Sequence, residues 1–139
     1  MDPNNPVVRL CAQGMEAEQS GRPDDARALF QQAWDTRSSD HEGCIAAHYL
    51  ARQQADDEAT FRWNLVALRL ADAIEEPQVQ EFYPSLHVCM ASSYQLLGDR
   101  TASLAHLNEA EQRIDVLRDS PYKDLIRQGI SNVRDRLDA

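Results

Sequence analysis

The sequence predicts an all-helical fold, and three observations lead to this prediction. Helix-forming residues such as Ala, Leu, Arg, Gln and Glu fill most of the chain. The six prolines and five glycines stand mainly where one helix would end and the next begin. Runs of alternating β-branched residues, which are typical of strands, do not occur. A chain of 139 residues can bury a core of its own without disulfides or metals, so we expect one domain over residues 1–139.

The first two predicted helices form a hairpin. Asn5 can cap a helix whose first position holds Pro6, because proline lacks the N–H that a first turn leaves unbonded. This helix should run to about Ser20. Gly21-Arg22-Pro23 breaks it and starts a second helix, which should stop near Arg37. In the second helix the apolar residues recur at the three- and four-residue steps of one helical face. They are Ala26, Leu29, Phe30, Ala33 and Trp34.

A second hairpin is predicted from the next pair of breaks. Ser38-Ser39-Asp40 supplies a cap for a helix that reaches about Gln54. Ala55-Asp56-Asp57 forms the turn, and a long helix then runs to about Glu75. Glu76-Pro77 interrupts the chain after it.

Three further helices are expected in the rest of the chain. Residues 78–97 read as helical, and Pro84 either kinks this helix or marks its true beginning. Gly98-Asp99 ends it, and the aspartate can cap a helix that reaches about Asp119. Ser120-Pro121 opens a last helix with one apolar stripe, which we expect to close the fold as a lid. The stripe consists of Ile126, Ile130, Val133 and Leu137.

The turns between the paired helices recur at a fixed period. Gly21-Arg22 returns as Ala55-Asp56 after 34 residues, and as Gly98-Asp99 after a further 43. The second interval is the same period with nine residues inserted around Pro77. A period of this length indicates a helical repeat protein.

At these positions the chain resembles the tetratricopeptide repeat family. The family's unit pairs a bulky-x-x-Leu-Gly-x-x-Tyr first helix with an Ala-x-x-x-Phe-x-x-Ala second helix. The matching residues are Leu10, Gly14, Ala17, Ala26, Phe30 and Ala33 in the first unit, Ala47, Thr60 and Ala67 in the second, and Tyr94, Gly98 and Ala110 in the third. In the third unit Ala91 replaces Gly, and Ser103 and Leu107 replace Ala and Phe.

The resemblance covers roughly residues 7 to 118 and implies a superhelix of antiparallel helix pairs. Its three repeats would span about 7–38, 41–76 and 78–119, with a capping helix over 121–138. The chain departs from the family in the second unit, where His48 and Asn64 stand in place of Gly and Phe. We expect both polar groups to have partners, because a buried polar group left unpaired costs about 1–3 kcal/mol. The family's closing proline is also replaced, by Ser38, Asp72 and Asp115.

The resemblance also implies a binding face, because the first helices of successive pairs line a concave surface in this family. An apolar floor with polar tips suits an extended peptide or a partner helix, with Tyr49 and Arg52 fixing its register and orientation. Arg52 is the sole cation there, so capture of a terminal carboxylate is not expected. At helical spacing the face would comprise Val8, Cys11, Met15, Glu18, Glu42, Ile45, Tyr49, Arg52, Ser85, Val88, Ser92 and Gln95.

The charge balance argues against nucleic acid as a partner. The chain has 23 acidic and 14 basic residues and a net charge of −9, which repels a phosphate backbone unless the arginines gather on one face. They are scattered from Arg9 to Arg136. No stretch approaches the roughly 18 apolar residues of a membrane span, and residues 1–10 lack the features of a leader. We therefore expect a cytoplasmic protein that binds neither nucleic acid nor membrane.

Catalysis, metals and cofactors are not expected either. His41 and His48 share a helical face but lie two turns apart, whereas metal-binding pairs usually sit three or four residues apart. His87 and Cys89 would point to different sides of a helix, and no glycine-rich elbow or phosphate loop occurs. The cysteines are too scattered for a disulfide framework or for paired metal ligands. They are Cys11, Cys44 and Cys89.

The sequence thus predicts a non-catalytic adaptor that binds a protein or peptide, as a monomer or homodimer. Two alternatives stay open: a self-associating structural module, and a sensor of a small ligand or signalling peptide. The sensor would use a pocket near the second unit and the inserted crossover, in which Arg52 meets an anion. The same residues could instead form a satisfied core. They are His48, Tyr49, Arg52, Trp63, Asn64, Phe82, Tyr83 and His87.

Overall fold

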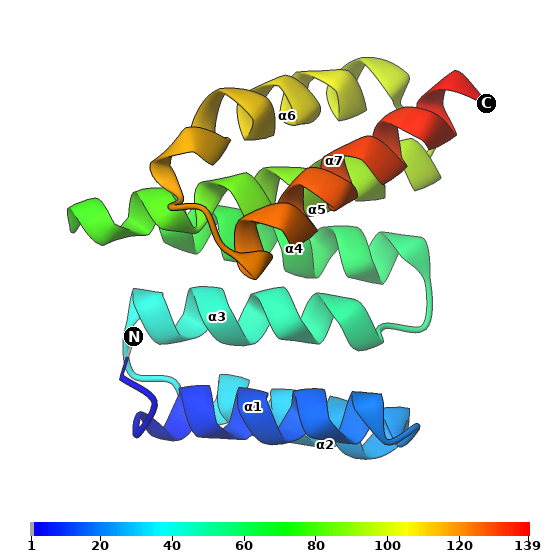
Figure 1. Ribbon diagram of the computed structural model, residues 1–139. Helices are drawn as coiled ribbons and strands as arrows, with labels where there is room; N and C mark the ends of the chain where they lie inside the picture. The colour runs from blue at the N-terminus through cyan, green and yellow to red at the C-terminus, as the bar shows by residue number, and fades with distance from the viewer. Residues whose placement is uncertain (1) are drawn as a thin grey trace. The chain divides into compact units, whose positions relative to one another are not determined.

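The computed structural model describes residues 2–139, and its regular secondary structure over that range is entirely helical (Figure 1). The predicted all-α class is therefore confirmed. The chain divides into two compact units, of which unit 1 ends at Ile74 and unit 2 begins at Glu75. The stacking of all the helices as one superhelical domain stays a prediction.

Unit 1 consists of two antiparallel helix hairpins (Figure 1). α1 pairs with α2, α3 pairs with α4, and α3 also packs against α1 and α2. Two predicted caps are present: Asn5 accepts from the N–H groups of Val7 and Val8, and Ser39 caps α3. Asp56, predicted only as part of the turn, caps α4. The elements are α1 (Pro6–Gln19), α2 (Pro23–Thr36), α3 (Asp40–Leu50), the 3₁₀ helix η1 (Ala51–Gln53) and α4 (Asp57–Asp72).

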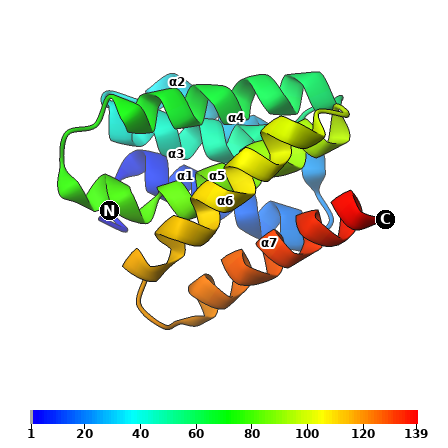
Figure 2. The ribbon, with the colours of Figure 1, turned by 90° about the horizontal axis from the view of Figure 1, so that it is seen from above.

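Unit 2 is a third hairpin followed by one more helix. α5 and α6 pack along their lengths, and α7 runs back beside them, opposite in direction to α6 (Figure 2). Pro84 lies in the first turn of α5, so it marks the beginning of the helix and causes no kink. The elements are the 3₁₀ helix η2 (Pro77–Glu81), α5 (Tyr83–Leu96), α6 (Arg100–Arg113), the 3₁₀ helix η3 (Ile114–Val116) and α7 (Pro121–Asp138).

The prediction that the helix after Asp99 reaches Asp119 is wrong. α6 ends at Arg113, and the chain continues through η3 into extended backbone at Leu117. Ile114 and Leu117 are both buried in one cluster with Ile126 of α7. The α-helix ends early because the tighter 3₁₀ turn of η3 directs the chain toward α7. The same turn keeps the side chains of Ile114 and Leu117 in the core.

The first and third hairpins turn in the same way. Gly21 and Gly98 both have positive φ, 73° and 85°, a conformation that glycine adopts without steric cost. The N–H of Arg22 donates to the Ala17 carbonyl at 2.8 Å. The corresponding groups 77 residues later form the same bond, in which the N–H of Asp99 donates to the Tyr94 carbonyl at 2.9 Å. The turn between α3 and α4 has no glycine. There the Gln54 side-chain amide donates to the Leu50 carbonyl at 2.8 Å, satisfying a carbonyl at the helix end.

A close approach holds the first hairpin together. Gly14 of α1 faces the ring of Phe30 on α2 so closely that a Cβ added at Gly14 would lie 2.2 Å from the ring. Phe30 is completely buried. The corresponding positions of the third hairpin, 77 residues on, hold Ala91 and Leu107, which are also completely buried. The two hairpins therefore fill the same place with two different pairs, Gly with Phe and Ala with Leu.

The last helix is bound to the rest of unit 2 by its apolar stripe. Ile126, Ile130 and Val133 are buried against α5 and α6, and Leu137 is partly buried beside them. The predicted stripe is thus confirmed. About 1.5–3 kcal/mol is expected for each apolar side chain of this size that is fully buried, so the stripe is sufficient to dock α7.

Candidate functional site

The predicted binding face begins where α1 and α3 lie side by side. At one end the Asn5 amide donates to Glu42 at 3.3 Å. At the other end Gln53 donates to Glu18 at 2.6 Å, and the Arg52 guanidinium lies 3.0 Å from the second Glu18 oxygen. The paired residues are 37 positions apart at the first end and 34 or 35 at the other. A nearly constant separation means that α1 and α3 run parallel, one repeat apart.

Tyr49 and Arg52 meet on this face. The Tyr49 ring stacks on Phe30 with centroids 5.4 Å apart and contacts His48 edge-on at 5.3 Å. The Arg52 guanidinium lies 5.6 Å from the Tyr49 ring. Tyr49 is half-buried, whereas 49% of the Arg52 side chain is exposed. The structure therefore brings Glu18, Tyr49 and Arg52 into one cluster, which we call the Tyr49–Arg52 cluster.

Burial keeps three titratable side chains of unit 1 uncharged at neutral pH. It lowers the pKa of His48 to about 4, with a further lowering by the Arg52 charge. It raises the pKa of the Cys11 and Cys44 thiols to about 12. At neutral pH the imidazole is uncharged and both thiols are protonated. Neither His48 nor the buried Asn64 is without a partner, as their core positions require.

The remaining predicted residues of unit 1 differ in how accessible their side chains are to a ligand. Val8, Met15 and Ile45 are half-buried, and Met15 and Ile45 pack with Tyr49 against the core. Cys11 is only 2% exposed and belongs to the core itself. The face is therefore formed by half-buried apolar side chains with charged groups at its ends.

The four predicted residues of α5 lie against α7. Ser85 hydrogen-bonds Tyr122, and Val88 approaches Gly129 so closely that a Cβ there would lie 3.1 Å away. Further along, Arg136 donates to two of them. Its Nε–H bonds the Gln95 oxygen at 2.8 Å, and its Nη2–H bonds the Ser92 hydroxyl at 3.0 Å.

These contacts repeat the arrangement of unit 1. Gln95 stands 77 residues after Glu18, and each accepts from the next parallel helix. The sequence contains a signal for the α7 contacts that our interpretation missed. Tyr122, Gly129 and Arg136 are spaced by seven residues, so they share one face of α7.

The residues of the alternative pocket are found in separate clusters. Trp63 packs edge-on against Trp34 at 5.0 Å, and the Arg37 guanidinium covers the other ring at 3.6 Å. In unit 2, His87 contacts Tyr83 and a residue that sequence reasoning did not select, His106. The signal was the Gly98 turn, which folds residues about ten positions before and after it onto one another.

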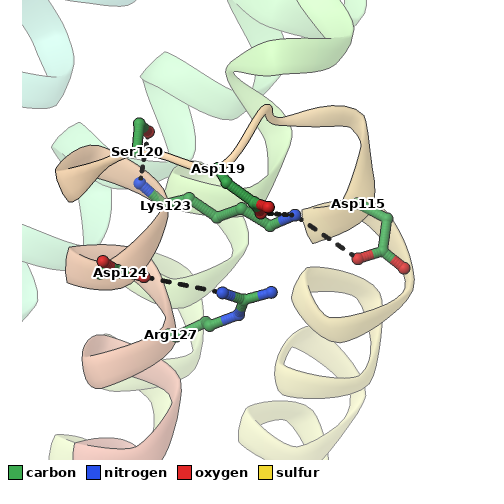
Figure 3. Close-up of polar contacts among 6 residues, drawn as sticks. All are labelled: Asp115, Asp119, Ser120, Lys123, Asp124 and Arg127. Atoms are coloured by element: carbon green, nitrogen blue, oxygen red, sulfur yellow. Dashed lines mark hydrogen bonds and ion pairs between the residues drawn. The ribbon is translucent and has the colours of Figure 1, made fainter.

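Lys123, the one lysine of the chain, is buried at the start of α7 (Figure 3). Its amine lies 3.4 Å from Asp119 and 3.8 Å from Asp115. Both carboxylates are almost fully exposed, with 93% and 87% of their side chains accessible. The aliphatic part of the lysine fills the core edge while its charge reaches the surface.

Replacing Lys123 with methionine should change the free energy of unfolding by less than about 1 kcal/mol, because ion pairs with exposed carboxylates contribute little. Methionine keeps the buried stem. Urea unfolding of the two proteins measures the difference. The matched control is Ile126→Ala, one turn along α7, which should cost about 2–4 kcal/mol through the cavity it leaves. A loss in Lys123→Met as large as that in the control would show that the ion pairs stabilise α7, and any loss clearly above about 1 kcal/mol would contradict the prediction.

Over residues 2–139, no group of three or more potential ligands is arranged to hold a metal ion. Within the same range, no helix has the length and apolar character needed to cross a bilayer. Comparison with protein-family models, with curated proteins and with solved structures returned no match.

Proposed function

We propose that the chain is a non-catalytic cytoplasmic adaptor of the tetratricopeptide repeat type, whose three helix pairs stack as a short superhelix. Its ligand is an extended peptide or a helix of another protein. The Tyr49–Arg52 cluster, on the face formed by α1 and α3, is the anchor point of that ligand.

Three local features support the repeat architecture. The first and third hairpins share the glycine turn and its hydrogen bonds. They also place a small residue against a large one at corresponding positions, Gly14 with Phe30 and Ala91 with Leu107. The parallel packing of α1 and α3, one period apart, is the relation that successive first helices have in such a superhelix.

The exposed guanidinium of Arg52 beside the half-buried Tyr49 ring is the observation that carries the binding proposal. Tyr and Arg are the residue types, with Trp, that most often dominate binding energy. The ring supplies apolar area, and the guanidinium offers charge-assisted hydrogen bonds. Half of the Arg52 side chain is open to water, so its guanidinium can reach a ligand carboxylate, while the largely buried Glu18 keeps its hydrogen bond from Gln53.

The proposal is tested with peptides selected from a displayed random library against the purified protein. Tyr49→Ala and Arg52→Ala should each weaken their binding about tenfold or more, as removal of an anchor residue does. Arg22→Ala is the matched control, since Arg22 also pairs with a carboxylate, at 3.2 Å, and is similarly exposed. Calorimetry gives the affinities, and circular dichroism verifies the folding of each variant. Equal binding to all four proteins would remove the Tyr49–Arg52 cluster from consideration.

A second candidate function is self-association through α7. Leu125 is 70% exposed and Tyr122 is 49% exposed on neighbouring turns of this helix, and exposed apolar residues that adjoin can form an interface between copies. Light scattering separates the two candidates. An adaptor remains a monomer or dimer without its ligand, whereas a structural module forms larger assemblies that Leu125→Glu would dissolve.

A further inference from the structure

Two histidines of unit 2 face each other across the α5–α6 hairpin. The Nδ1 atoms of His87 and His106 lie 2.9 Å apart. Each of the two rings also stacks on a tyrosine. Tyr83 lies on His87 with centroids 5.8 Å apart, and Tyr94 lies on His106 at 5.5 Å. The two imidazoles meet edge to edge, with centroids 5.2 Å apart, and each carries one tyrosine on its face.

Proton counting limits the charge that this pair can hold. A hydrogen bond between two Nδ1 atoms needs one protonated and one unprotonated nitrogen. A first added proton can be accommodated, because an imidazolium on one side still donates to the neutral ring on the other. A second added proton places two N–H groups and two positive charges face to face at 2.9 Å. The packed pair therefore carries at most one positive charge.

One carboxylate close to the pair, Glu109, is also bound by an arginine. His87 is 8% exposed and His106 is half-buried. Burial lowers the pKa of His106, and Glu109 on the same helix opposes this lowering. Glu109, however, is itself bound by Arg113 at 3.0 Å, and Arg113 also lies over the Tyr83 ring at 4.7 Å and donates to Gln80 of η2. The facing carboxylate is thus shared with a permanent cation.

We propose that the His87–His106 pair is an acid-sensitive latch that joins α5 to α6 in unit 2. Above the titration range of histidine the shared hydrogen bond joins the two imidazoles across the hairpin. Acidification puts a proton on both rings and separates the two helices. Because α7 packs on both α5 and α6, its docking loosens in the same step and uncovers the α5 face that carries Ser92 and Gln95.

The sign and size of the effect follow from the protons that each state binds. Unfolded histidine titrates near pH 6.5. Each proton that the open state binds and the folded state does not makes opening about tenfold more favourable per pH unit below that value. The latch is therefore fully closed above about pH 6.5 and weakens as the pH falls. This inference is independent of the proposed function.

The test is hydrogen exchange of the full chain between pH 7 and pH 5, with rates corrected for intrinsic pH dependence. Amides of α5 and α6 in the native protein should lose protection about tenfold per pH unit below pH 6. His106→Gln keeps a side chain that can accept and donate but does not titrate, so the loss should vanish. His48→Gln, in unit 1, is the control and should retain it. An identical loss in the native protein and His106→Gln would overturn the latch.

A measurement on the unmutated protein guards against a variant that fails to fold. Nitrogen-15 spectra of the imidazole rings distinguish a protonated from an unprotonated Nδ1. We expect one of each in His87 and His106 at pH 7.5, with the second protonation coinciding with the loss of α5 and α6 protection. Independent protonation of both rings near pH 6.5 while protection persists would equally overturn the proposal.

Discussion

Replacing Gly14 with alanine should destabilise unit 1 by about 2–3 kcal/mol, although alanine is the better helix former by about 1 kcal/mol. The added Cβ would lie 2.2, 2.6 and 2.8 Å from three atoms of the Phe30 ring. That ring has no room to move, because it is completely buried and stacks on Tyr49. The helices must separate, and the core around Phe30 loses its contacts.

The third hairpin indicates how the damage is repaired. Ala91 and Leu107 occupy the corresponding positions there, so Phe30→Leu should restore much of the stability lost in Gly14→Ala. Phe30→Leu alone leaves a gap beside Gly14 and should cost about 1 kcal/mol or more. Urea unfolding followed by tryptophan fluorescence measures all four proteins, since both tryptophans, Trp34 and Trp63, belong to unit 1. Additive losses in the double variant would contradict the proposed close packing.

Acidification from pH 7 to pH 4 should cost unit 1 about 2 kcal/mol through His48 alone. Its folded pKa is lowered to about 4, by burial first and by the Arg52 charge second. Unfolded histidine binds its proton near pH 6.5, so the unfolded state gains protons before the folded state does. The stabilisation is complete above about pH 6.5 and is lost progressively as the pH falls toward 4. Because the His48 ring is only half-buried, solvent screening makes this loss of stability smaller than the full pKa difference would give.

His48→Gln should make the acid response of unit 1 shallower, as measured by the tryptophan fluorescence midpoint in urea at each pH. His106→Gln serves as the control, because it removes a titrating ring from unit 2, whereas both tryptophans belong to unit 1. If the native protein and His48→Gln lose stability equally between pH 7 and pH 4, His48 does not contribute to the acid response.

Helix positions were predictable because their causes are local. Asn5, Ser39, Asp56, Asp99 and Ser120 each accept a backbone N–H at the start of a helix, and these short polar side chains are adjacent in sequence to the groups they cap. Likewise the glycines of the first and third turns are required by a left-handed backbone. The early end of α6 was missed, because residues 114–117 follow the position of α7, which lies farther along the chain.

The candidate face was predictable only in part. Helical spacing correctly indicated that Glu18, Tyr49 and Arg52 lie near one another. It did not reveal that Cys11 is buried or that Ser92 and Gln95 are bonded by Arg136. Helical periodicity gives the direction of a side chain but not the element that packs over it.

The sequence by itself determined the helices, their caps, the 34-residue period and the apolar stripe of α7, because each depends on interactions within a few turns of one helix. Only the tertiary structure decided which polar groups meet. The pairing of His87 with His106 and of Arg136 with Gln95 joins residues 19 and 41 positions apart. Such contacts depend on the axial shift between packed helices, which core side chains such as Leu107 and Ile130 set together and which no single segment encodes.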